Sequence, residues 1–362
     1  MLNAAVEASA FLPFETERLT VRAMRPSDAE ALAAYRNDPG VARYQDWELP
    51  FTPQMARRLI AAMDGISAPV PNEWVQMAIE DRDGALVGDL AVYVDTDVRV
   101  ALIGYTLAAA HHGRGYATEA AGALVDRLFG VLGVHRVAAT LDPENTASAR
   151  LLERLGFRYE GRGRGAAYVR GGWADDDRYA ILADERREWL LRPHEPPATV
   201  DLVEITRGNI GRVTALATHR SQQQFVATIQ ESFIDAFLPE VVDGRPLVPW
   251  LRAIEADGDV VGFVMLAIRT DAHPEAFLWR FLVDARHQRR GIGRRALHRV
   301  AEHLLAGGDE VLQVSWVEGP GGPADFYLRL GFVPTGEIVD GETLAAIALT
   351  QLIAATADRA EV

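Results

Sequence analysis

A repeated pattern of glycines constrains the fold of this chain more than any other feature. The strand-like LVGDLAVYV around Gly88 is matched by VVGFVMLAI around Gly262, and GRGYA at Gly115 is matched by RRGIG at Gly291. A third landmark, ERLGF, is matched by LRLGF, and the three offsets are 174, 176 and 175 residues. Offsets this constant indicate a duplicated domain, because chance glycines would not keep both order and spacing.

The boundary between the two copies is predicted in the segment RPHEPPAT. Its three prolines interrupt the pattern after the helix-like DERREWLL. A chain of 362 residues is also long enough for two domains that each bury a core. We therefore predict a first domain over residues 1–191, a linker over 192–199 and a second domain over 200–362.

Each half has the pattern of a mixed α/β domain. Short runs rich in β-branched and aromatic residues precede each glycine loop, and the D-G turns at Asp83-Gly84 and Asp257-Gly258 indicate antiparallel strands. A shorter helical segment is expected near the start of each half, over 27–37 and 210–218. After each loop the apolar residues recur at helical spacing. The fold class is therefore α/β with a mixed sheet, in which a central strand leads through a glycine loop into a long helix.

Composition excludes several function classes. The chain has no cysteine, which rules out disulfides, thiolate metal sites and a catalytic thiol. Its formal net charge of −14 disfavours nucleic acid and favours encounter with cationic small molecules. It has no apolar stretch of membrane-spanning length and no signal-peptide pattern, so we expect a cytoplasmic protein without membrane contact. The histidines show no metal-ligand spacing.

The glycine loops have the chemistry of an anion site. A loop that opens a helix leaves backbone N–H groups pointing outward, with the positive end of the helix dipole behind them. Such a site suits a pyrophosphate. In the second half, four arginines around Gly291 and Gly293 add charge: Arg289, Arg290, Arg294 and Arg295. Neither loop is a six-residue Rossmann fingerprint, and the chain has no lysine to complete a P-loop.

These motifs resemble the GNAT superfamily of acyl-CoA-dependent N-acyltransferases. The run from Gln288 to Gly293 fits the Q/R-x-x-G-x-G/A signature, and FYLRLGF from Phe326 to Phe332 resembles the second signature. Residues 11–190 are similar to ribosomal-protein alanine N-acetyltransferases, through TERLTVRAMRPSDAEAL, GRGYATEA and GVHRVAATLDPENTASARLLERLGF. Residues 200–350 are similar to polyamine (spermidine and diamine) acetyltransferases, through SQQQFVATIQESF and WRFLVDARHQRRGIG.

The resemblance implies two tandem GNAT domains that each bind acetyl-CoA, with the pyrophosphate on the loop and the pantetheine along the preceding strand. The implied cofactor residues of the second domain are Phe281, Leu282, Val283, Gln288, Arg289, Arg290, Gly291, Ile292, Gly293 and Arg294. Those of the first domain are Tyr105, Leu107, His112, Gly113, Arg114, Gly115, Tyr116, Ala117, Asn145 and Ser148. Asn145 and Ser148 also suit a helix cap.

The resemblance also implies direct transfer to an amine, which needs a base for the ammonium and an acid for the departing thiolate. In the second domain Tyr327 matches the family's acid. Asp284 and Glu342 are candidate catalytic carboxylates, and Glu231 is a candidate for binding the ammonium.

The first domain departs from the family pattern. Leu102 stands where a glutamate is frequent, Leu152 stands at the position of Tyr327, and His112 replaces Gln or Arg. In the second domain, PGGPADFY replaces the usual Asn-x-x-Ala approach to the tyrosine.

We therefore expect an acetyl-CoA-dependent N-acetyltransferase that modifies a primary amine of a small cationic molecule, with the second domain as the main catalyst. A polyamine or an amino-bearing antibiotic fits, and the latter would make this a resistance enzyme. Two alternatives stay open: a peptide or protein N-terminal acetyltransferase working through the first domain, and a non-enzymatic acyl-CoA sensor. The chain is expected as a monomer with an internal pseudo-dimer or as a homodimer.

Overall fold

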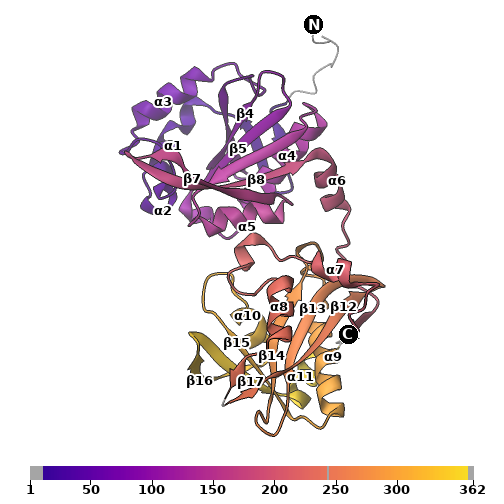
Figure 1. The fold of residues 1–362 in the computed structure, drawn as a ribbon. Helices are drawn as coiled ribbons and strands as arrows, with labels where there is room; N and C mark the ends of the chain where they lie inside the picture. The colour runs from indigo at the N-terminus through magenta and orange to yellow at the C-terminus, as the bar shows by residue number, and fades with distance from the viewer. Residues whose placement is uncertain (1–10, 243, 358–362) are drawn as a thin grey trace. The chain divides into compact units, whose positions relative to one another are not determined.

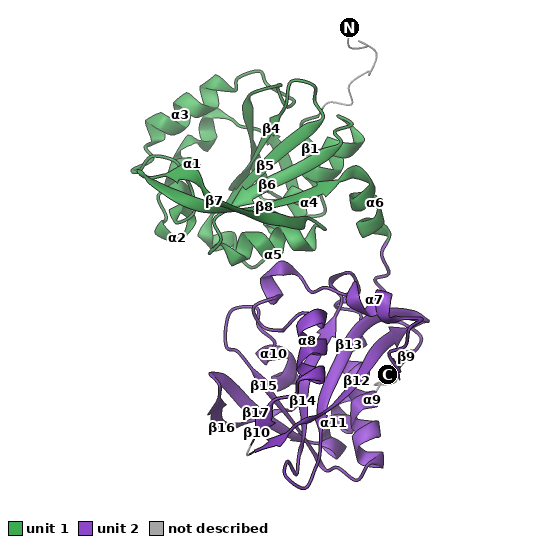
Figure 2. Ribbon diagram, in the orientation of Figure 1, with its two compact units in different colours: residues 1–191 green, residues 192–362 purple. Residues whose placement is uncertain are grey.

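The structure is a computed structural model that describes residues 11–242 and 244–357. It divides into two compact units, residues 1–191 and residues 192–362 (Figure 2). The proline-rich segment 192–199 belongs to the second unit. Within the described residues, no helix combines the length and apolar character that a membrane crossing requires.

The first unit is built on an eight-stranded sheet (Figure 1). Its strand order is β1-β2-β3-β4-β5-β6-β8-β7, and every neighbouring pair is antiparallel except β5 and β6. The strands are β1 (Phe14–Glu15), β2 (Leu19–Ala23), β3 (Trp74–Asp81), β4 (Leu86–Val94), β5 (Val100–Leu107), β6 (Arg136–Leu141), β7 (Arg158–Val169) and β8 (Gly172–Leu182).

The helices of the first unit contribute to two apolar clusters. Apolar residues of α4 and α5 pack with the sheet in the main core, whereas α1 and α3 pack together in a smaller cluster. The α-helices are α1 (Ala29–Arg36), α2 (Pro39–Ala42), α3 (Pro53–Ala62), α4 (Tyr116–Gly130), α5 (Thr146–Arg154) and α6 (Ala183–Leu191). The 3₁₀ turns are η1 (Pro26–Asp28) and η2 (Ala109–His111).

The second unit repeats this plan with a seven-stranded sheet in the order β16-β17-β15-β14-β13-β12-β9. Its single parallel pair is β14 and β15, and β10 with β11 forms a separate short hairpin. The strands are β9 (Val200–Val203), β10 (Val241–Val242), β11 (Arg245–Pro246), β12 (Val248–Ala256), β13 (Asp259–Ile268), β14 (Ala276–Val283), β15 (Val311–Trp316), β16 (Val333–Val339) and β17 (Glu342–Ala348).

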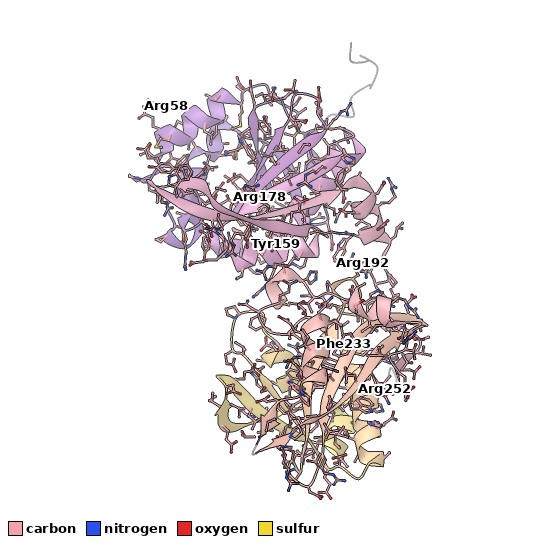
Figure 3. The ribbon with its side chains drawn as sticks, viewed as in Figure 1. Arg58, Tyr159, Arg178, Arg192, Phe233 and Arg252 are labelled. Carbon is pink, nitrogen blue, oxygen red and sulfur yellow. The ribbon has the colours of Figure 1, made fainter. Side chains whose placement is uncertain are left out.

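The helices of the second unit also lie in two clusters. Apolar residues of α9, α10 and α11 pack with the sheet in its main core. Helix α8 packs in a second cluster, in which Phe233 meets Phe263 edge to face at 5.9 Å between ring centroids (Figure 3). The α-helices are α7 (Ile210–Thr214), α8 (Ile229–Phe237), α9 (Ile292–Ala306), α10 (Ala324–Arg329) and α11 (Leu349–Thr356), and the 3₁₀ turns are η3 (Arg220–Gln222) and η4 (Ala285–His287).

In both units the central sheet opens at the strand that leads into the glycine loop. Strand β5 pairs with β6 only at Val100, Ala101 and Leu102. Strand β14 pairs with β15 only at its first three residues, Ala276 to Leu278. Because later residues of β5 and β14 have no recorded partner on this side within the described chain, their backbone groups are exposed to a ligand there.

The structure confirms the predicted mixed α/β fold class. The expected strands before each loop are β3, β4 and β5 in the first unit and β12, β13 and β14 in the second, and α4 and α9 follow the loops. The helical segment expected over residues 210–218 is shorter, because α7 ends at Thr214.

Candidate functional site

The glycine loop of the second unit connects β14 to the start of α9. Gly291 is the N-cap of this 15-residue helix and has a φ of 75°, in the left-handed region that favours glycine. The first turn of α9 begins with the bond from Arg295 N–H to Gly291 O, at 3.2 Å. The earlier N–H groups lie outside the helical ladder, so the loop has the geometry of an anion site.

Gly293 lies in a closely packed position. A Cβ at this position would lie 3.3 Å from Phe326 Cζ and 3.5 Å from Phe281 Cε1. The two rings stack with their centroids 6.2 Å apart and an interplanar angle of 11°. This glycine therefore lets helix α9 approach the aromatic residues of β14 and α10.

The arginines around the loop divide into two pairs. Arg289 and Arg294 line the cavity described below. Arg290 is buried, and its guanidinium donates to Glu195 O at 2.8 Å and to His287 Nδ1 at 3.0 Å. Arg295 donates to the carbonyls of Pro197 and Ala198.

The prediction that Arg290 and Arg295 add charge to a phosphate site is therefore not supported. Their guanidinium groups hold the proline-rich segment against the start of α9 instead. Arg289 and Arg294 remain as the cationic side chains of the loop.

The glycine loop of the first unit has the same backbone form. Gly113 and Gly115 have φ values of 74° and 80°, and Gly115 is the N-cap of α4, also a helix of 15 residues. The side chain of His112 turns back, and its Nε2 donates to Leu107 O at 3.0 Å. In the second unit Gln288 Nε2 donates to Val283 O at the same distance. His112 thus preserves the bond made by the glutamine of the other copy.

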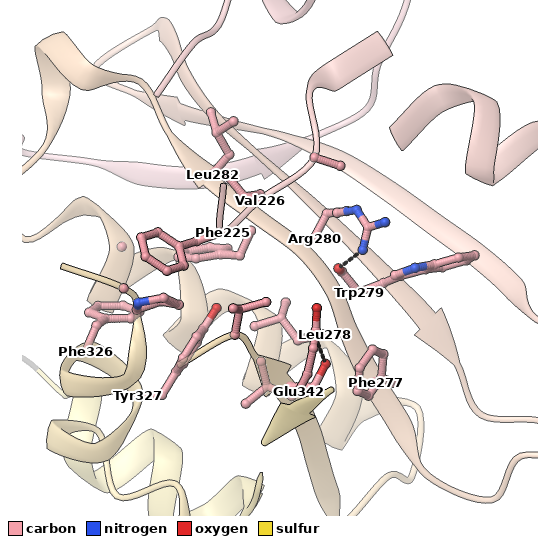
Figure 4. A pocket seen from close by; sticks show the side chains of 18 of the residues that line it. Phe225, Val226, Phe277, Leu278, Trp279, Arg280, Leu282, Phe326, Tyr327 and Glu342 are labelled. Atoms are coloured by element: carbon pink, nitrogen blue, oxygen red, sulfur yellow. Dashed lines mark hydrogen bonds between the residues drawn. The ribbon is translucent and has the colours of Figure 1, made fainter. Parts of the chain in front are cut away.

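A cavity of about 1490 Å³ lies within the second unit. It extends from the glycine loop past the open part of β14 to α10 and β17 (Figure 4). The predicted site residues that line it are Phe281, Leu282, Val283, Gln288, Arg289, Gly291, Ile292, Gly293, Arg294, Glu231, Tyr327 and Glu342. The cavity therefore brings together the loop, the exposed strand edge and the predicted acid.

Tyr327 is held on α10 by aromatic contacts. Its ring stacks on Trp316 at 5.7 Å between centroids and meets Phe326 and Phe332 edge to face. The residue is 6% exposed, yet it lines the cavity, and the hydroxyl has no recorded hydrogen-bond partner among the described residues (Figure 4). Burial raises the pKa of Tyr327 above its ordinary value. The phenol therefore keeps its proton at neutral pH.

Glu342 begins strand β17 and lines the same cavity. It is half-buried, and its Oε2 accepts a hydrogen bond from Ser315 Oγ. Figure 4 shows the Tyr327 and Glu342 side chains in the same part of the cavity, with Leu278 and Phe277 beside them. A protonated phenol and a carboxylate thus share this end of the site.

Glu231 also lines the cavity, but it caps its own helix. Its carboxylate accepts from Thr228 N and Thr228 Oγ1, each at 2.8 Å, at the start of α8. The hydrogen bonds from the Thr228 backbone and side chain lower the pKa of Glu231. A carboxylate that stays charged is compatible with ammonium binding and poorly suited to take up a proton.

The structure places Asp284 outside the cavity, at a turn, and so does not support the predicted catalytic role. It is 3% exposed, and its carboxylate accepts from Arg286 N, Arg286 Nε and Ala217 N at 2.9–3.1 Å. It caps the turn η4 and is not among the cavity residues. With its acceptors occupied, Asp284 fixes the turn between β14 and the loop.

The first unit has a different group at the position of Tyr327. Leu152, at the position of Tyr327, is fully buried in the apolar core. Tyr105 on β5 meets Ser148 instead, with their hydroxyl oxygens 2.6 Å apart, and burial raises the pKa of Tyr105. Asn145 caps α5 by accepting from Ser148 N at 3.1 Å, so the cap interpretation of this residue holds.

Arg114, Tyr116 and Ala117 occupy the loop and first turn of α4. The carbonyl of Arg114 accepts from Arg18 Nη1 at 2.9 Å, and the Arg18 guanidinium lies 4.8 Å from the centroid of the Tyr116 ring. The N-terminal segment of the first unit therefore braces its glycine loop.

Sequence reasoning missed several cavity residues. Phe225 packs on Gly319 and Gly322, where a Cβ would approach its ring to 3.2 Å. This contact explains Gly322 of the PGGPADFY segment, whereas Gly321 has a positive φ of 77°. Ser315 was also missed, although VLQVSW alternates buried and partly exposed residues and places this serine on the partly exposed side. A polar residue on that side of a central strand was the signal available.

Comparison with known proteins identifies both units. An acetyltransferase (GNAT) domain matches residues 18–158, and the acetyltransferase (GNAT) family matches residues 213–332. The uncharacterized N-acetyltransferase p20 of Bacillus licheniformis is 33% identical over 171 residues, 47% of this chain and 96% of that protein. The uncharacterized N-acetyltransferase YnaD of Bacillus subtilis is 31% identical over 170 residues, 47% and 96% of the respective chains.

Among solved structures, Mycobacterium smegmatis RimJ in complex with CoA-disulfide is 26% identical, with a TM-score of 0.43, over 49% of this chain and 90% of that chain. The family matches confirm the predicted fold class, the enzyme class and acetyl-CoA as the cofactor. The chain therefore belongs to the GNAT acetyltransferase family, with two such domains in tandem.

Proposed function

We propose that the second unit transfers the acetyl group of acetyl-CoA to a primary amine of a small cationic molecule, such as a polyamine or an amino-bearing antibiotic. The observation that carries this proposal is the single cavity that joins the glycine loop to Tyr327 and Glu342. The second unit thus offers a cofactor site and two proton-transfer groups in one continuous space.

The loop residues fit the anionic end of acetyl-CoA. The positive φ of Gly291 aims backbone N–H groups outward at the start of α9, and the cavity-lining Arg289 and Arg294 supply positive charge. The unpaired edge of β14 beyond Leu278 can take hydrogen bonds from the amide-bearing arm. Acetyl-CoA itself supplies an acetyl thioester, the activated group that the amine receives.

Tyr327 and Glu342 would divide the proton transfers. The phenol of Tyr327 holds its proton at neutral pH, because burial raises its pKa, and can deliver that proton to a departing sulfur. Glu342 offers a carboxylate that can remove a proton from an ammonium, directly or through one water.

The lining of the cavity favours a cationic acceptor. Seven carboxylates line it: Glu231, Asp235, Glu240, Glu275, Asp325, Asp340 and Glu342. Four arginines line it as well, of which Arg289 and Arg294 belong to the loop and Arg280 is paired with Asp235 at 2.9 Å. The excess of negative charge away from the loop would attract an amine in its ammonium form.

A screen for CoA release tests this proposal. Acetyl-CoA would be offered with spermidine, kanamycin or a peptide that begins with alanine, using the full chain. The matched loop variants Gly291→Val and Gly115→Val place a β-branched residue at φ values of 75° and 80°. We expect turnover of a small amine that Gly291→Val abolishes and Gly115→Val retains.

The opposite outcome identifies the other candidate function. Turnover of the peptide that is lost in Gly115→Val and kept in Gly291→Val would mean that the first unit works as an N-terminal acetyltransferase. Because the chain is an acetyltransferase, the sensor hypothesis can apply to one unit at most, and Leu152 at the position of Tyr327 favours the first unit for it. Two acetyl-CoA bound per chain by calorimetry, with turnover confined to the second unit, would support it.

A further inference from the structure

Ser315 lies where the central sheet of the second unit opens. The last paired residues of the parallel strands are Leu278 on β14 and Val314 on β15, and Ser315 is the next residue of β15. On its other side Ser315 pairs with Leu344 of β17, two residues from Glu342. The sheet therefore places the serine hydroxyl beside the Glu342 carboxylate, at the edge of the cavity.

The contacts of Glu342 differ from those of the other cavity carboxylates. Five of the seven are exposed to solvent: Glu231, Glu240, Glu275, Asp325 and Asp340. Asp235 is half-buried and forms an ion pair with Arg280. Glu342 is half-buried, and its recorded partner within the described residues is the neutral hydroxyl of Ser315.

This arrangement suits a proton acceptor. The hydroxyl of Ser315 occupies Oε2 of Glu342, which leaves Oε1 as the oxygen available to a ligand in the cavity. This single neutral donor fixes the orientation of the carboxylate.

We propose that Ser315 is a positioning residue for the acetyl transfer, with a hydroxyl that orients Glu342 toward the ammonium of the acceptor. This inference rests on the proposed function of the second unit. The ammonium loses one proton to Glu342, and the amine nitrogen forms the new C–N bond as the C–S bond breaks. The sulfur takes the proton of Tyr327, and the second proton released by the nitrogen returns to Tyr327 through solvent.

Ser315 should affect turnover more than binding. A carboxylate that can rotate away from the ammonium lowers kcat, whereas the loop that binds acetyl-CoA is unchanged. We expect Ser315→Ala to reduce kcat about tenfold, which is less than the loss expected from removing the base Glu342 itself. The KM for acetyl-CoA should stay within about twofold. Ser315→Thr keeps a hydroxyl on the same carbon and should restore most of the rate.

Thr343 provides a matched control. Its hydroxyl lies one residue from Glu342 but donates to Glu318 Oε1 at 3.1 Å, and Thr343 is not among the cavity residues. Thr343→Val removes a hydroxyl from the same part of the sheet, so it should leave kcat unchanged. Calorimetry with acetyl-CoA would show that each variant is folded and binds.

The experiment measures kcat and KM for the full chain with whichever of spermidine, kanamycin and the alanine peptide is turned over. An unchanged kcat in Ser315→Ala, an equal loss in Thr343→Val or a failure of Ser315→Thr to recover would overturn the role of Ser315. The variants Glu342→Gln and Tyr327→Phe separate the role of Ser315 from the proposed function of the second unit. If both of these keep full activity, the proposed function fails as well.

Discussion

The loop before α4 in the first unit and the loop before α9 in the second contain equivalent hydrogen bonds. Different side chains donate them. His112 donates to Leu107 O and Gln288 donates to Val283 O, each at 3.0 Å. Both loops then reach a glycine with positive φ that caps a helix of 15 residues. The apparent departure at His112 thus preserves the function of the position, which is to fix the end of the central strand.

The units differ where the reaction is expected. Strand β14 contains a β-bulge, since Met265 pairs with Arg280 and Leu266 pairs with Leu278, which leaves Trp279 outside the ladder. The corresponding strand β5 pairs with β4 without a register shift. A bulge redirects side chains and often lies beside an active site. The unit with the bulge is also the unit in which a buried tyrosine, Tyr327, lines the cavity, so both differences support the proposal that the second unit is the catalyst.

In a third comparison, the helix after each glycine loop holds a preceding segment of the chain, through an acceptor in the first unit and a donor in the second. Glu119 on α4 accepts from Thr16 Oγ1 and from the backbone and side chain of Arg18. Arg295 on α9 donates instead to the carbonyls of Pro197 and Ala198. Glu119 attaches the turn before β2, and Arg295 attaches the segment before β9, to the helix that follows the glycine loop. The same connection can therefore be built from opposite charges.

The largest expected effect separates the catalytic positions of the two units. Tyr327→Phe removes the proposed acid and should lower kcat about 10²-fold to 10³-fold while acetyl-CoA still binds. The first unit has Leu152 at the position of Tyr327, so the control there is Tyr105→Phe, which removes a buried phenol from β5 and should leave kcat of the second unit within about twofold. Steady-state CoA release and calorimetry would measure both. A greater loss in Tyr105→Phe than in Tyr327→Phe would reverse the comparison.

The reversed contact predicts a difference in pH dependence. Burial alone would raise the pKa of Glu119, but hydrogen bonds from Thr16 and Arg18 outweigh it and lower the pKa below the ordinary value of 4.5. Its contribution to stability is therefore present above about pH 4.5 and is lost as the pH falls through the lower folded-state pKa.

Glu119→Gln should destabilise the first unit by about 1–2 kcal/mol at pH 7, a figure discounted for the partly exposed Arg18. The difference from wild type should shrink at pH 3. Arg295→Gln is the matched change, and its effect should be independent of pH in this range, because arginine stays charged. Chemical unfolding at the two pH values tests this. Equal pH dependence in both variants contradicts the assignment.

The smallest expected effect concerns His112. His112→Gln installs the side chain of the second unit and should change unfolding free energy by less than about 0.5 kcal/mol. His112→Ala removes the donor to Leu107 O and should cost about 1 kcal/mol. Thermal unfolding compares the two variants. If His112→Gln lowers the unfolding free energy as much as His112→Ala, the hydrogen bond to Leu107 O is not the contribution of residue 112 to stability.

Local patterns determined much of the fold and part of the site. The constant offsets predicted the duplication, and the short runs rich in β-branched and aromatic residues predicted β4 and β13. The change to helical spacing predicted α4 and α9. These features depend on neighbours in the chain, since backbone geometry fixes the periods of strands and helices. Tyr327 was found because its motif is local as well.

Tertiary contacts decided which charged groups line the cavity of the second unit and which hold other parts of the chain. The sequence alone does not show that Asp284 caps a turn whereas Glu342 lines the cavity. It also does not show that Arg290 holds a distant segment whereas Arg289 lines the cavity. Some partners of these side chains are distant in the sequence, 67 residues for Asp284 and Ala217 and 95 residues for Arg290 and Glu195. Duplication and fold were therefore determined by the sequence itself, because both follow from local periodicity. The assignment of carboxylates and arginines was decided only by the tertiary structure, because the role of a charged group depends on which atoms already satisfy it.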